Sequence, residues 1–340
     1  MDIIENLLVI GNGFDLDLGL PTKFSDFAKS EYWPKAKKID DPIKFPTRTA
    51  HGGFNAITPI YPTVLLEHYL EDKLDKELWF DLEKCLLDYA SPNVSKEIVD
   101  PSQEDESDIK KNIAYYDMVR DALGQYIADV QNSHPINSNS VAGKTLQTII
   151  KNGFFRHICS FNYTNLNRIA KQLGISKEIN YYHIHGSVAD NNNSIILGVH
   201  EAELREGYDR FRKTQSEYYT FHNLYTELDN ANEIVFFGLS FGEIDYSYFN
   251  LFFKNLVSSS HYAEAEKDKK RITIFTKDND SRHAVLSSLR KMGIDVQRLF
   301  AQSIFQIICT AEGLDGNVFC DFCKRLNENG FKRFGGKKEQ

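Results

Sequence analysis

The chain lacks the long apolar run that a membrane-spanning helix requires. None of its segments approaches the ~18 consecutive uncharged apolar residues of such a helix. Its N-terminal sequence MDIIENLLVI has acidic residues where a secretory signal has basic ones, and its apolar run is only four residues long. We therefore expect a cytoplasmic protein that does not associate with membranes.

Cysteine is also scarce. The five cysteines are an odd number and are widely separated: Cys85, Cys159, Cys309, Cys320 and Cys323. This distribution is typical of a reduced cytoplasmic chain and not of a disulfide scaffold. The pair Cys320-x-x-Cys323 stands alone, whereas a structural zinc site usually has two such pairs. We expect these two cysteines to pack within a C-terminal helix.

An excess of basic residues is absent. The 40 lysines and arginines are outnumbered by 48 acidic residues, which gives a formal net charge of −8. This balance argues against a protein that coats DNA or binds anionic surfaces. Hydrophobic residues make up 41% of the chain, which is enough for a sizeable core and excludes global disorder.

Proline is missing from the later part of the chain, because all nine prolines lie between positions 21 and 135. Proline removes a backbone donor and is disfavoured in central strands, so the later part of the chain can form regular helices and strands. Residues 40–62 contain four prolines and two adjacent glycines, which predicts a long loop.

Short continuous apolar runs predict strands that are buried on both faces, as in a parallel sheet. These runs lie at residues 7–10, 234–238 and 272–275, with weaker examples at 157–161, 180–185 and 195–199. Helical patterns at 245–256 and 281–292 lie between or after them. The alternation predicts an α/β fold, a Rossmann-like and mainly parallel sheet flanked by helices.

Between residues 27 and 150, the alternation of strand and helix patterns is interrupted. Residues 64–90 and 113–130 have helical periodicity, and the acidic segment 91–111 lies between them. We predict a mostly helical insertion or lid at 27–150 within a discontinuous Rossmann-like domain formed by 1–26 and 151–330. Residues 331–340 are expected to form a flexible tail.

The first candidate site is the sequence Gly11-Asn12-Gly13-Phe14-Asp15, which follows the first apolar run. Glycine after a buried strand permits a sharp turn and a close backbone approach to a ligand. Neither the GxGxxG spacing nor that of a P-loop is present, so a plain strand-to-helix turn is the alternative.

Two further candidates follow later strands. Asn162, in SFNYTN, offers both donors and an acceptor, or alternatively caps the next helix. His185, in HIHGS, stands at a strand end with Gly186 after it and is a candidate general base. The alternatives are a structural histidine or a metal pair of His183 and His185.

The turn after residues 234–238 is the fourth candidate. Gly238 and Ser240 are placed to contact a ribose or a phosphate, and Asp245 begins a helix that it could instead cap. The sequence Gly143-Lys144-Thr145 is similar to part of a phosphate-binding loop. It lacks the preceding glycine and strand, so we expect an ordinary helix there.

Taken together, these motifs resemble the AbiH family of bacterial phage abortive-infection proteins. The opening LLVIGNGFDLDLGLPTKFSDF carries the resemblance, with W-x-D-x-E at 79–83, then FNYTN, HIHGS and GLSFGEIDYSYF. The resemblance implies a role in phage defence, with a phage or host protein as the trigger. It leaves open whether the chain forms homo-oligomers.

More distantly, the same motifs are similar to the sirtuin-like NAD-binding domain. That resemblance implies that Asn162 lies near the nicotinamide ribose and that His185 is catalytic. Asn12 and Asp15 replace small residues of the sirtuin motif, and Phe24 stands in place of its arginine. The zinc-binding cysteine pairs of sirtuins are absent, so we expect neither protein deacylation nor a metal.

The resulting hypothesis is an enzyme that binds NAD or a related nucleotide and cleaves its nicotinamide–ribose bond, as an NAD glycohydrolase does. Its catalytic residues would be His185, Asn162 and Asp15. The expected nucleotide-binding residues are Gly11, Asn12, Gly13, Phe14, Pro21, Thr22, Gly186, Gly238, Ser240 and Asp245. A non-catalytic nucleotide sensor is the main alternative, and a metal-dependent nuclease using the two histidines is a weaker one.

Overall fold

The computed structural model describes residues 5–35, 43–48, 54–60, 64–76, 81–94, 104–153, 155, 157–188, 194–200, 202–258 and 269–333. The chain forms two compact units. The first comprises Met1–Lys23, Ile127–Ile195 and Tyr218–Gln340, and the second comprises Phe24–Tyr126 and Ile196–Glu217. Residues 127–150, predicted within the insertion, thus belong to the first unit, whereas 196–217 belong to the second.

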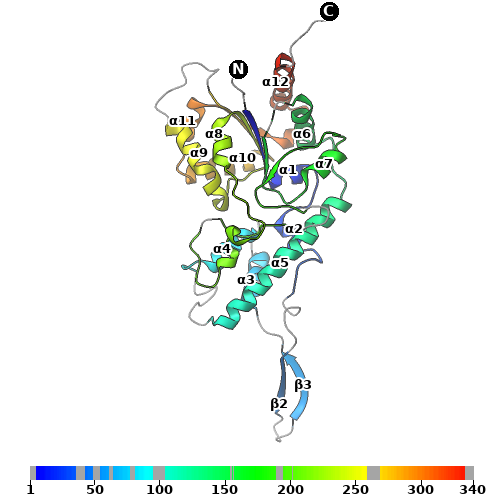
Figure 1. Ribbon diagram of the computed structural model, residues 1–340, viewed down its shortest axis with the longest axis vertical. Coiled ribbons are helices and arrows are strands. Elements are labelled where there is room, and N and C mark those ends of the chain that lie inside the picture. Colours follow the sequence, from blue (N-terminus) through cyan, green and yellow to red (C-terminus); the bar gives the residue numbers. More distant parts are fainter. Residues whose placement is uncertain are drawn as a thin grey trace, which may run out of the picture. The chain divides into compact units, whose positions relative to one another are not determined.

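The first unit is built on a six-stranded parallel sheet (Figure 1), whose strands follow the order β5-β4-β1-β6-β7-β8. The strands are β1 (Glu5–Ile10), β4 (His157–Ser160), β5 (Tyr182–His183), β6 (Ala231–Phe237), β7 (Arg271–Thr276) and β8 (Ile304–Cys309). Counted within this sheet, the order is 3-2-1-4-5-6, the arrangement of the Rossmann fold. The prediction of a Rossmann-like α/β fold is confirmed.

Helices cover both faces of this sheet. On one face, apolar side chains of α8 (Leu224–Asn230), α9 (Tyr246–Ser258), α10 (Asn279–Lys291) and α11 (Val296–Gln302) join one core with the strands. On the other face, Phe14 of α1 (Asn12–Asp17) packs on Phe237, and Phe322 of α12 (Asn317–Arg333) packs on Phe275. The remaining helices of this unit are α6 (Val141–Asn152) and α7 (Leu166–Gln172). None of the described helices combines the length and apolar character needed to cross a bilayer.

The apolar run at 195–199, predicted as a strand, is not one. Val199 forms a single bridge with Arg212, and Gly198 adopts a φ of 133° beside the carbonyl of Phe211. Ile196 and Leu197 are buried, so the run is apolar because it packs in a core and not because it pairs in the sheet. Conversely, β8 was not predicted, because Gln306 interrupts its apolar run and donates to Thr273 Oγ1 at 3.1 Å.

The second unit contains a hairpin that the sequence did not predict. Residues 40–62 were expected to form a long loop, but β2 (Ile43–Arg48) pairs antiparallel with β3 (Phe54–Ile60). The register shifts between Phe45 and Thr47, at the proline that lacks a donor. A two-stranded sheet has only edge strands, which tolerate proline better than central ones.

The helices of the second unit include the two predicted segments. They are α2 (Phe24–Ala28), α3 (Leu65–Lys76), α4 (Leu82–Ala90) and α5 (Glu106–Ser133), whose last residues belong to the first unit. Of the W-x-D-x-E motif, Asp81 caps α4 by accepting from Lys84 N at 3.1 Å, and Glu83 forms a buried ion pair with Lys213 at 3.0 Å. Trp79, the first residue of this motif, lies outside the described residues.

Candidate functional site

Two glycine turns meet beyond the carboxyl ends of β1 and β6, where the strand order reverses. Gly11 N donates to Phe237 O at 2.8 Å, and Gly13 N donates to Gly238 O at 2.9 Å. A Cβ on Gly13 would lie only 2.6 Å from Gly238 Cα, and Gly238 itself has a φ of 69°. The glycines are therefore needed for this close approach, and the Gly13 N–H is already occupied by a protein carbonyl.

The rest of the first turn is also held by contacts within the unit. Thr22 Oγ1 donates to Asn12 Oδ1 at 2.6 Å, and Asn12 Nδ2 donates to Thr22 O at 3.2 Å. These bonds fix the loop that carries Pro21 against the start of α1. The ring of Phe14 is buried edge-on to Phe237, with centroids 5.3 Å apart, so it packs in the core of the sheet.

Asp15 is the most unusual group near the edge of the sheet. It is 1% exposed, and its Oδ2 accepts a hydrogen bond from Thr164 Oγ1 at 2.8 Å. Burial raises the pKa of Asp15 to about 7, against the lowering effects of Thr164 and Asn162. This carboxyl group can therefore exchange a proton near neutral pH, the range in which general acids and bases work best.

Asn162 approaches Asp15 from the end of β4 and is also buried. The Asn162 side-chain amide lies near enough to Asp15 to favour its ionised form, but within the described part of the chain neither Asn162 Nδ2 nor Asp15 Oδ1 completes a hydrogen bond. The backbone of Asn162 is held on both sides, since its N–H donates to Ser160 Oγ at 3.2 Å and its carbonyl accepts from His183 Nδ1 at 3.3 Å. The next helix, α7, is capped by Asn165 and not by Asn162.

The two histidines of the HIHGS motif have different surroundings. His183 is held by the carbonyl of Asn162, and burial lowers the pKa of His183 to about 4, so its ring is neutral at pH 7. His185 is 5% exposed, and its ring lies 5.0 Å from that of Phe161 and 5.9 Å from that of Tyr248 of α9. Gly186, with a φ of 71°, turns the chain away directly after it.

The turn after β6 presents the last two predicted residues. Ser240 is exposed, and Asp245 ends a short 3₁₀ turn (Glu243–Asp245) directly before α9. Between them, Phe241 has a φ of 51°, the only positive value among the described residues other than glycine. Its fully buried ring packs on Phe249 and holds this strained conformation.

The structure thus brings together Asp15, Asn162 and the two glycine turns at one edge of the sheet. Thr164, which bonds Asp15, was not predicted as a site residue, and His183, considered from the sequence only as one of a metal pair, instead holds the backbone of Asn162. Thr164 stands two residues after Asn162 in the same motif, and this proximity is the only signal for it in the sequence. The ring of Tyr248 lies 5.9 Å from that of His185, but the two residues are 63 positions apart in sequence, so no local motif predicts their contact.

These features define a Rossmann-like, doubly wound α/β protein with polar residues beyond the carboxyl ends of its central strands. The chain belongs to the bacteriophage abortive infection AbiH family, whose family model matches residues 7–263. The resemblance seen in the motifs is thereby confirmed, and it supports a role in abortive infection. No curated protein and no solved structure matches the chain.

Proposed function

We propose that the edge formed by β1, β4 and β6 binds NAD or a related nucleotide and that the bound nucleotide loses its nicotinamide by hydrolysis. The proposal is supported by the strand order, because ligands of open α/β sheets bind at the carboxyl ends of strands where that order reverses. In abortive infection, such an activity would deplete the NAD of an infected cell after a phage trigger.

The observation that carries the proposal is the pair of buried polar atoms at this edge. Asp15 Oδ1 and Asn162 Nδ2 make no hydrogen bond within the described residues. Leaving such a group unsatisfied costs about 1–3 kcal/mol, so a ligand that bonds to both would recover that free energy. A ribose hydroxyl or a water molecule, each with a donor and acceptors, has the required chemistry.

The proposed hydrolysis begins at the bond that joins nicotinamide to its ribose. The bond between ribose C1′ and the nicotinamide nitrogen breaks, and both electrons stay on the nitrogen, which leaves a ribose with oxocarbenium character. The ionised carboxylate of Asp15 would stabilise this positive charge. A water oriented by Asn162 adds to C1′, and His185 takes its proton, directly or through a ribose hydroxyl. The products are nicotinamide, ADP-ribose and a proton.

A nucleotide sensor without catalysis is the second candidate, and one contact favours it. The Gly13 N–H, which a pyrophosphate would need as a donor, bonds to Gly238 O instead. Binding of this kind would rest on the ribose and base, with the second unit available to a phage or host protein.

The two candidates are separated by incubating the purified protein with NAD, NADP and ADP-ribose derivatives, with and without lysate from infected cells. Binding is measured by calorimetry and products are read by mass spectrometry. Accumulation of nicotinamide and ADP-ribose supports the hydrolase. Binding of the nucleotide with no product in either condition supports the sensor, and no binding of any nucleotide contradicts both.

A further inference from the structure

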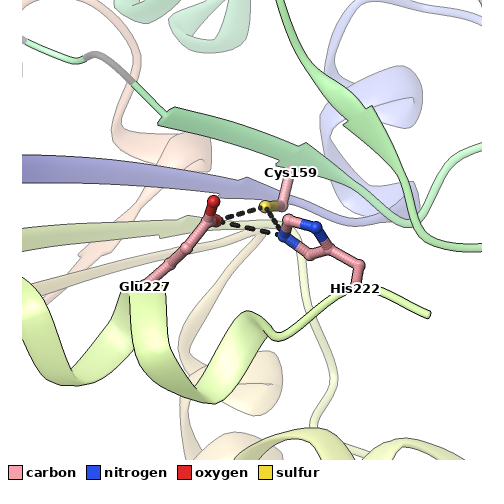
Figure 2. A group of neighbouring side chains, drawn as sticks. All are labelled: Cys159, His222 and Glu227. Carbon is pink, nitrogen blue, oxygen red and sulfur yellow. Dashed lines mark hydrogen bonds and ion pairs between the residues drawn. The ribbon is translucent and has the colours of Figure 1, made fainter.

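A second cluster of reactive side chains lies on the face of the sheet that α8 covers. Cys159 projects from β4, Glu227 belongs to α8, and His222 lies just before that helix (Figure 2). All three belong to the first unit, and Figure 2 shows their ends pointing toward one another. None of them contributes to the site proposed for the nucleotide.

The donor atoms of this cluster form a small triangle. Cys159 Sγ lies 3.5 Å from His222 Nε2 and 3.1 Å from Glu227 Oε2, and the last two atoms lie 3.2 Å apart. Ligand atoms around a tetrahedral zinc ion are roughly 3.3–3.6 Å apart, given metal–ligand distances of ~2.0–2.3 Å. The triangle therefore has the size of one face of a zinc coordination tetrahedron.

A nucleophilic triad does not fit the same contacts. In such a triad the histidine uses one ring nitrogen for the nucleophile and the other for the carboxylate. Here His222 Nε2 faces both Cys159 and Glu227. Burial and the Glu227 carboxylate also raise the pKa of the Cys159 thiol, which keeps it protonated in the absence of a cation.

The surroundings hold the three side chains in place. His157 Nδ1 lies 3.0 Å from Glu227 Oε1, the carboxylate oxygen that does not face Cys159. The exposed ring of Tyr182 stacks on His222, with centroids 4.2 Å apart. Burial opposes ionisation of Glu227, but hydrogen bonds from His222 and Cys159 outweigh it and lower the pKa of this carboxyl group. An outer partner for a ligating carboxylate is a usual feature of metal sites.

We propose that Cys159, His222 and Glu227 bind a zinc ion, with the fourth coordination position open to water or another small ligand. One sulfur, one nitrogen and one oxygen donor suit zinc and exclude the hard cations Ca²⁺ and Mg²⁺. The ion would displace the thiol proton of Cys159 and fasten the segment before α8 to β4. His157 would orient the Glu227 carboxylate from outside the coordination shell.

The test uses the full chain, freed of metal with a chelator and titrated with Zn²⁺ or with Co²⁺ as a spectroscopic substitute. We expect one ion per chain and a thiolate-to-cobalt charge-transfer band. Cys159→Ser should abolish the band, and His222→Ala should abolish tight binding of Zn²⁺. His157→Ala should weaken binding about 10–100-fold, as loss of an outer partner does.

Cys309→Ser is the matched control, because Cys309 is also a buried free cysteine of the same sheet. It should bind Zn²⁺ and Co²⁺ like the unaltered protein. Circular dichroism confirms that each variant is folded, and His222→Ala, on the segment before α8, covers the case in which Cys159→Ser does not fold. Failure of the folded, unaltered protein to bind Zn²⁺ would overturn the proposal, as would unchanged binding by His222→Ala.

Discussion

At the scale of single residues, the ionisation of the buried Asp15 carboxyl group affects both the stability of the protein and its proposed activity. Burial raises its pKa, so the folded protein keeps a proton that the unfolded chain has already released. A group with this property lowers stability at neutral pH. Buried carboxyl groups with raised pKa values cluster at functional sites, which fits the ligand-binding role proposed for Asp15 and Asn162.

We predict that Asp15→Asn stabilises the protein at high pH. The folded pKa is about 7 and the ordinary value is 3.8, so the free energy of unfolding falls as pH rises through this window. The loss reaches at most about 4 kcal/mol above pH 7. Thermal unfolding from pH 4 to 8 should show a gain for the variant that grows with pH. A variant that is less stable than the parent at pH 8 would contradict the account.

His183 should have the opposite effect on acid stability. Its folded pKa is about 4 and its ordinary value is 6.5, so the unfolded chain takes up a proton first as pH falls. Stability contributed by the neutral ring is therefore lost between about pH 6.5 and 4, by up to ~3 kcal/mol. Chemical denaturation of His183→Gln should show a flatter dependence on pH in this window. An unchanged slope would mean that His183 is not the group responsible.

At the scale of elements, the turns after β1 and β6 form one unit through their glycines. Two backbone hydrogen bonds join them, and their α-carbons lie too close for any side chain between them. Their mutual packing fixes the edge of the sheet at which the candidate site lies.

We predict that Gly13→Ala is destabilising, because its Cβ would lie 2.6 Å from Gly238 Cα and the backbone would have to move. Overpacking of this kind costs ~1–3 kcal/mol. The matched control is Gly242→Ala, whose Cβ would meet only Ser240 Oγ at 3.4 Å and should be nearly neutral. Urea denaturation of both variants measures the difference. Equal stabilities would show that the two turns can separate without cost.

The sequence predicted those elements whose signal is local. The runs at 7–10, 234–238 and 272–275 are strands because each is continuously apolar and buried in the sheet. The run at 195–199 has the same composition but is buried by other contacts, and composition cannot distinguish the two. The pairing of β2 with β3 was not predicted, because the prolines in these segments indicated a loop. A two-stranded sheet has only edge strands, and edge strands tolerate proline.

The sequence predicted only part of the candidate site, because only some of its contacts follow from local patterns. A parallel sheet collects the ends of its strands at one edge, so residues after separate strands could be expected to meet there. The packing of Gly13 on Gly238 depends on two turns that are distant in sequence, and no spacing reveals it. The contacts of Cys159 with His222 and Glu227 join residues 63 and 68 positions apart, beyond the reach of any local motif.

At the scale of the whole molecule, the AbiH family match spans parts of both units, from residue 7 to residue 263. Its motifs fall into two groups. FNYTN, HIHGS and the two glycine turns lie at or beyond strand ends of the first unit, whereas Asp81 and Glu83 stabilise α4 in the second. We therefore expect the first group to contact the ligand, whereas the second group stabilises the fold of the second unit.

NAD turnover by the purified protein in lysate from infected cells, compared with that of His185→Ala, tests the proposed hydrolysis most directly. We predict that nicotinamide and ADP-ribose accumulate and that His185→Ala lowers the rate ~10²–10⁴-fold, the usual contribution of a general base. Asn162→Ala should lose activity similarly, and His283→Ala, which alters an exposed histidine of α10, should not. Turnover by His185→Ala at the rate of the unaltered protein, or NAD that stays intact in every sample, would contradict this proposal.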